Sequence, residues 1–170
     1  MLIAVKEGIM KKFLTVLFML IAVQTAVYAD AETDMHQVYI AKIQAQDIKY
    51  NTFNFFNAIN SGNTQLVDLF LKAGMSPDST FMKTPAIYMA IASNQNEVVK
   101  LLLENKVDPN KELAGITPLI MAIREKDAKI VETLIAYGAD VNQEAGYTKP
   151  LAYAIKKNRL ISLLVHFFPL

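Results

Sequence analysis

The chain contains no cysteine and only two histidines among its 170 residues. Without a thiol it forms no disulfide framework, has no cysteine nucleophile and carries no lipid-modified N-terminal cysteine. His36 and His166 lie far apart in the sequence, and neither thiolates nor a His-x-x-x-His spacing supply a zinc ligand set. The six glycines are scattered singly, so no phosphate-binding loop is predicted. We therefore expect no catalytic residue, no metal and no cofactor.

The one long apolar run lies within residues 1–29, which have the order of features of a secretory signal peptide. Lys11 and Lys12 form a basic start, FLTVLFMLIAV follows, and QTAVYA ends with a small residue at Ala29. We predict cleavage after Ala29. The alternatives are an uncleaved membrane anchor, for which the run is short of about 20 apolar residues, or a buried core helix. Met10 is an alternative start, because MKKFLTVLF is a more ordinary opening than the printed one.

An excess of charge of one sign is also lacking, since 17 Lys and Arg residues stand against 16 Asp and Glu residues. Removing residues 1–29 takes away three lysines and one glutamate, so no basic excess remains. The balance predicts neither nucleic acid nor an anionic membrane surface as a partner.

The most regular feature of the chain is the dipeptide Ala-Ile, which recurs every 32 residues. The copies begin at Ala58, Ala90, Ala122 and Ala154. Paired apolar residues follow the first three copies at constant distances, with the i, i+3, i+4 spacing of a helix. One such unit cannot bury its apolar face alone, so about three or more must stack. The pattern predicts an all-α solenoid of about four units, each made of two short helices.

Local signals place the ends of these helices. Thr117 is suited to cap a first helix, with Pro118 at its first position. Gly74 ends a second helix where a left-handed residue is favoured, whereas Lys106 occupies that place in the next unit and predicts a less regular ending. One extra residue after Pro85 predicts an irregular start to the first helix of the second unit.

These residues resemble the ankyrin repeat, whose unit is about 33 residues long. The closest match is GITPLIMAIREKDAKIVETLIAYGADVN, residues 115–142, and MKTPAIYMAIASNQNEVVKLLLENKVDPN, residues 82–110, is a second. The resemblance implies repeats at about 52–81, 82–114, 115–146 and 147–168. The histidine of the family's Thr-Pro-Leu-His signature normally hydrogen-bonds to neighbouring loops. It is replaced by Phe56, Tyr88, Ile120 and Ala152. We therefore expect packing to hold the turns instead.

Residues 30–51 fall outside the repeats. Val38, Ile40, Ile43 and Ile48 could form one apolar stripe, so we predict an N-terminal helix that caps the array. A flexible spacer is the alternative, because the segment opens with DAETD.

The lack of catalytic residue patterns predicts a protein without enzymatic activity, and we expect a monomer. The resemblance implies that it binds another protein through the concave side of the array. With the predicted signal peptide, the expected location is the periplasm, or outside the cell. A periplasmic partner could be an exported enzyme that the protein supports or inhibits. The alternative is a secreted effector that binds a host protein.

The predicted binding residues lie on the turns and at the ends of the first helices. They are Phe81, Met82, Lys83, Leu113, Ile116, Arg124, Glu125, Tyr147, Lys156 and Lys157, with Ala92, Ser93, Ala114 and Thr148 beside them. The apolar members stand out because exposed aromatic and methionine side chains are typical interface anchors. The alternative is that each tucks beneath its own turn and stabilises it.

Overall fold

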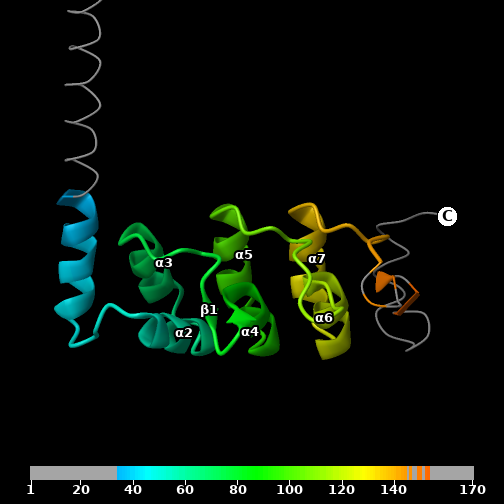
Figure 1. The fold of residues 1–170 in the computed structure, drawn as a ribbon, viewed down its shortest axis with the longest axis horizontal. Coiled ribbons are helices and arrows are strands. Elements are labelled where there is room, and N and C mark those ends of the chain that lie inside the picture. Colours follow the sequence, from blue (N-terminus) through cyan, green and yellow to red (C-terminus); the bar gives the residue numbers. More distant parts are fainter. Residues whose placement is uncertain (1–33, 145, 147–148, 151, 154–170) are drawn as a thin grey trace, which may run out of the picture.

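The computed structural model describes residues 34–144, 146, 149–150 and 152–153. A helical segment at 34–44 precedes three helix pairs, which form two rows in Figure 1. The first helices are α2 (Thr52–Asn60), α4 (Ala86–Ala92) and α6 (Pro118–Glu125), and the second helices are α3 (Thr64–Lys72), α5 (Asn96–Glu104) and α7 (Ala128–Ala136). The predicted signal peptide and most of the predicted fourth repeat lie outside the described residues.

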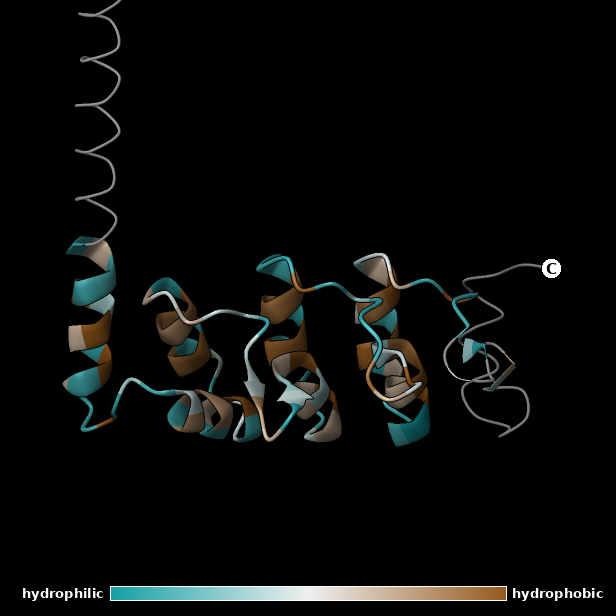
Figure 2. Cartoon of the chain, viewed as in Figure 1, coloured by the Kyte–Doolittle hydropathy of each residue, from teal (hydrophilic) through white to brown (hydrophobic). Residues whose placement is uncertain are grey.

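The core runs along the array between the two rows of helices. Each helix packs against its pair and against its equivalents in the adjacent units. Ala58, Ala90 and Ala122 are buried where the first helices cross, which explains why a small side chain recurs at this position. Leu102 and Leu134 are fully buried at equivalent second-helix positions, as the repeat register predicts. In Figure 2 the hydrophobic colour follows the helices and the connecting turns are mostly hydrophilic.

The helix ends follow the sequence signals with one correction. The Thr117 side chain accepts a hydrogen bond of 3.2 Å from the Ile120 amide, with Pro118 in the first turn. Lys106 has a φ of 69°, close to the 92° of Gly74, so the prediction of a less regular ending there is wrong. Its own N–H and that of Val107 bond to carbonyls of α5, and the Val107 side chain is buried. These contacts outweigh the left-handed strain of about 1–2 kcal/mol.

A short hairpin precedes α4, and the irregular first turn predicted for that helix is not seen, because α4 is α-helical from Ala86. Strands β1 (Thr80–Phe81) and β2 (Thr84–Pro85) pair antiparallel, and α4 begins after Pro85 without a side-chain cap. The two residues at the tip, Met82 and Lys83, have φ values of 49° and 66°. Positive φ at both positions is the geometry of a type I′ turn, in which asparagine and glycine are the favoured residues.

The helical segment 34–44 lies at the N-terminal end of the rows, beside α3 (Figure 1). Ile43 is fully buried, and Tyr39 and Ile40 pack against the core. The prediction is wrong for Val38, which is 42% exposed, because Tyr39 occupies the inner face in its place. Ile48 packs on the core from beyond the helix end.

Tyr50 holds in place the connection between the helical segment 34–44 and α2. Its ring stacks on Phe70 at 5.6 Å between centroids, and its hydroxyl donates a hydrogen bond of 3.0 Å to the Ala73 carbonyl.

Across the described residues, no helix is both long enough and apolar enough to cross a bilayer.

Candidate functional site

The predicted site residues that the structure describes lie on the hairpin of residues 80–85, on the turn of residues 113–116 and at the C-terminal ends of α4 and α6. We call these parts together the hairpin face. The hairpin contacts α2, and the turn of residues 113–116 is tied to α4, so each projecting loop rests on the first helix of the preceding unit. The loops are therefore presented by a stacked scaffold.

Aromatic packing attaches the hairpin to the first unit. The Phe81 ring lies 5.6 Å from the Phe56 ring and 6.0 Å from the Phe53 ring, measured between centroids. Phe56 occupies the position of the family's signature histidine. The prediction that packing replaces that histidine's hydrogen bonds is therefore confirmed at Phe56.

At Tyr88, by contrast, the same prediction is wrong. The Tyr88 hydroxyl lies 2.9 Å from the Lys111 carbonyl oxygen and 2.5 Å from the Ile116 carbonyl oxygen. Tyrosine keeps a donor at the end of an apolar ring, so it can bond to the next loop much as a histidine would. Burial raises the pKa of the Tyr88 hydroxyl well above its usual range, which keeps the hydroxyl protonated and able to donate.

We expect Tyr88→Phe to lower the free energy of unfolding by about 0.5–1.5 kcal/mol, since it removes the hydroxyl donor from the part-buried carbonyl groups of Lys111 and Ile116. Chemical denaturation measures this loss. The raised pKa means that the folded state retains the Tyr88 proton at high pH. Stability from this group is complete below the unfolded pKa of about 10 and falls as the pH rises above it. The Phe variant should lose stability less steeply above that pH, and an equally steep loss would contradict the assignment.

The predicted binding residues on the turns fall into an exposed group and a partly buried group. Met82 is 84% exposed at the hairpin tip, and Lys83 beside it is also exposed. Phe81 and Leu113 are partly buried and pack against the core, as the alternative interpretation of these residues describes. Ile116 is half-buried and pairs with Leu113 through two backbone hydrogen bonds of 3.0 and 3.1 Å. Met82 and Lys83 are thus the residues of this set that solvent reaches most freely.

The helix ends supply the rest of the face. Ala92 is exposed at the end of α4, and the Ser93 hydroxyl lies 2.7 Å from the Asn60 side-chain oxygen. Arg124 and Glu125 are exposed at the end of α6, where Arg124 Nε lies 3.3 Å from Glu125 Oε1. The remaining predicted residues, Tyr147, Thr148, Lys156 and Lys157, lie outside the described residues.

The sequence analysis missed Phe53. This side chain is 55% exposed in the first turn of α2, next to Phe81. A signal was available, because Phe53 stands five residues before the repeated alanine, where the third unit has the capping Thr117. Asn51 caps α2 instead, so Phe53 serves no capping role.

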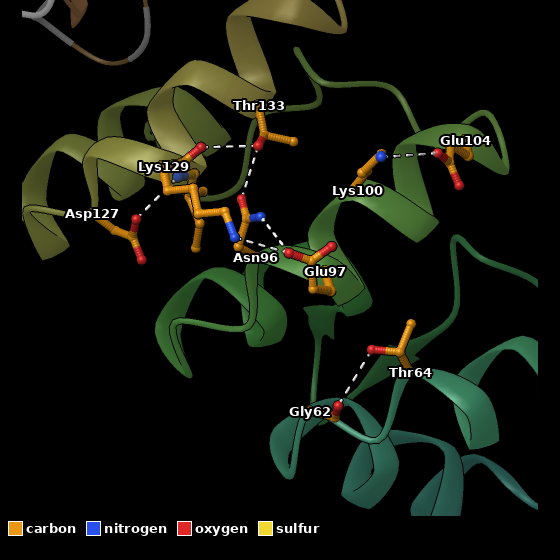
Figure 3. Close-up of polar contacts among 10 residues, drawn as sticks. Gly62, Thr64, Asn96, Glu97, Lys100, Glu104, Asp127, Lys129 and Thr133 are labelled. Carbon is orange, nitrogen blue, oxygen red and sulfur yellow. Dashed lines mark hydrogen bonds and ion pairs between the residues drawn. The ribbon is translucent and has the colours of Figure 1, made fainter.

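The second helices form another surface, where polar contacts join α5 to α7 (Figure 3). Lys129 Nζ lies 2.9 Å from Glu97 Oε1, and the Thr133 hydroxyl lies 2.8 Å from the Asn96 side-chain oxygen. The Lys129 hydrogen bond is the main cause that lowers the pKa of Glu97. The ion pair links two adjacent units. Because both of its side chains are largely exposed, it contributes little to the free energy of unfolding.

A metal site requires a set of ligating side chains that lie close together. Over the described part of the chain, no group of three or more His, Asp or Glu side chains is placed to hold a metal ion.

Stacked helix pairs with projecting loops define the class as a helical repeat solenoid. The model of a known family, ankyrin repeats in three copies, matches residues 2–112 and again residues 55–145. The chain therefore belongs to the ankyrin-repeat family. Ankyrin repeats are generally protein–protein interaction modules and typically are not enzymes. No curated protein matches the chain.

Proposed function

We propose that this chain is an exported, monomeric interaction protein that binds a periplasmic partner through the hairpin face. The observation that carries the proposal is Met82. It is an apolar side chain held 84% exposed on a left-handed backbone conformation that methionine seldom adopts. Folding alone favours asparagine or glycine there, and local strain of this kind is typical of functional sites. The partner in this proposal is an exported protein, such as an enzyme that is supported or inhibited.

The surface is tested with two matched alanines. Ala92 and Ala136 are both exposed at the last residue of a helix, α4 on the hairpin face and α7 on the second-helix surface. The tagged mature chain is used to capture its partner from a periplasmic extract, and affinity for that partner is then measured. We expect Ala92→Arg to weaken binding about tenfold or more and Ala136→Arg to leave it unchanged. The reverse result would assign binding to the second-helix surface.

Export rests on the signal-like order of residues 1–29. The family match begins at residue 2, within that segment, so the cleavage site needs its own measurement. We expect the exported protein to begin at Asp30, and its intact mass decides this. A chain that retains residues 10–29 would exclude cleavage. Fractionation separates the two locations, since a protein found in the medium and absent from the periplasm would favour the secreted effector.

A further inference from the structure

An apolar corner lies at the N-terminal end of the hairpin face. It consists of Phe53, Phe81, Met82 and Lys83, and we call it the aromatic corner. The rings of Phe53 and Phe81 meet edge-on at 61°, with centroids 6.0 Å apart. Phe53 from α2 and Met82 from the hairpin tip are each more than half exposed. Phe53 is thus exposed at the start of a helix beside Phe81, and Met82, which follows Phe81 in the chain, is exposed at the hairpin tip.

Neither helix capping nor turn geometry accounts for the exposure of these side chains. Five large apolar side chains are exposed in the described part of the chain, and two of them belong to this corner. Asn51, not Phe53, caps α2, and the turn at Met82 and Lys83 gains nothing from either side chain. Clustered apolar exposure on a rigid scaffold marks interaction sites, whereas single exposed residues are ordinary.

The aromatic corner also contains a positive charge, the ammonium group of Lys83. Lys83 is exposed, and no carboxylate among the described residues lies within ion-pair distance of it. Lys111, a lysine in the next loop, already pairs with Asp78 at 3.0 Å. A partner that brings a carboxylate to this corner therefore meets an ammonium group with no competing partner in the described structure.

We propose that the aromatic corner anchors a partner segment in which a bulky apolar side chain stands next to a carboxylate. This proposal rests on the proposed function. The apolar side chain lies against the edge of Phe53 and the thioether of Met82, and the carboxylate pairs with Lys83. Aromatic edges and methionine accept varied apolar shapes, which suits an anchor pocket. The lysine adds orientation, since a reversed segment would place its carboxylate against apolar surface.

Random peptides displayed on phage test this chemistry directly, with the full mature chain as the target. From the wild type we expect peptides that share a bulky apolar residue next to Asp or Glu. From Lys83→Glu we expect the acidic residue to be replaced by Lys or Arg. Failure to enrich any peptide, or the same consensus from both targets, would overturn the proposal.

The best wild-type peptide is then synthesised and its affinity measured by fluorescence anisotropy. Met82→Asp and Phe53→Asp should each weaken binding about tenfold or more. Met35→Asp is the matched control, because Met35 is 48% exposed on the segment 34–44, outside the corner, and its affinity should not change. Lys83→Gly relieves a left-handed strain, so it should fold at least as well while binding weakens about fivefold or more. Unchanged affinity in Lys83→Gly and Met82→Asp would place the peptide elsewhere.

The two proposals fail in different ways. If the peptides lack the expected pattern while Ala92→Arg still abolishes capture of the native partner, the anchor is wrong and the hairpin face stands. If the peptides bind the corner as expected while Ala92→Arg retains full capture, the anchor chemistry stands and the native partner uses another surface.

Discussion

Replacing Leu102 by alanine is expected to lower the free energy of unfolding by about 2–5 kcal/mol, the range for a buried leucine that leaves a cavity. Leu102 is fully buried in α5, which packs against α3 on one side and α7 on the other. A cavity there weakens two interfaces between units as well as the pairing of α5 with α4. In a solenoid, stability is approximately a sum over units and their interfaces, so a central defect has no substitute contacts elsewhere.

Chemical denaturation of the mature chain measures this loss. Lys100→Ala is the control in the same helix, because Lys100 is exposed and its ion pair with Glu104 is long at 3.9 Å. We expect that control to stay within about 0.5 kcal/mol of the wild type. A loss of less than about 1 kcal/mol for Leu102→Ala would contradict the stacking of α5 between its neighbours.

Phe70→Ala is expected to cost about 3–5 kcal/mol and to loosen the N-terminal segment as well. Phe70 is fully buried in α3, with its ring 5.6 Å from Tyr50 and 5.7 Å from Phe55. Tyr50 is the residue that fixes the chain between the segment 34–44 and α2. Removing the Phe70 ring therefore weakens both the first unit and the attachment of the helix in front of it.

Hydrogen exchange distinguishes this local effect from general destabilisation. Amides of residues 34–50 should lose more protection in Phe70→Ala than amides of α6 and α7. Tyr50→Phe keeps the ring and removes only the hydrogen bond to Ala73, so it should cost about 0.5–1.5 kcal/mol. Equal loss of protection along the whole array would show that Phe70 does not act through Tyr50.

Phe56 and Tyr88 each attach a projecting loop to the preceding unit, but they do so by different interactions. The register placed Phe56 and Tyr88 at one equivalent position, and packing was predicted for both. Phe56 can only pack, so the prediction held there. Tyr88 can pack and donate, and which it does depends on whether a carbonyl of the next loop lies within reach. Ile116, 28 residues away, supplies that carbonyl, and no local pattern specifies it.

In the candidate site, too, the repeat register predicted the positions of the residues, and their exposure depends on the neighbouring unit. The repeat register located the turn residues, and Met82 and Lys83 are exposed as a binding residue must be. Phe81 and Leu113 have the same apolar character but are partly buried, because each lies against the preceding unit. Phe53 was missed because its neighbour Phe81 is 28 residues distant and enters only when the hairpin folds onto α2.

The sequence by itself determined the helical units, their spacing of 32 residues and the small residue at each crossing, since these follow from periodicity, caps and side-chain volume. Tertiary structure alone decided that Tyr39 replaces Val38 on the inner face, that Lys106 adopts the conformation of a glycine, and that Phe53 joins Phe81 at an exposed corner. The physical reason is that local patterns fix which residues form a helix, whereas exposure depends on which neighbouring unit covers each side chain.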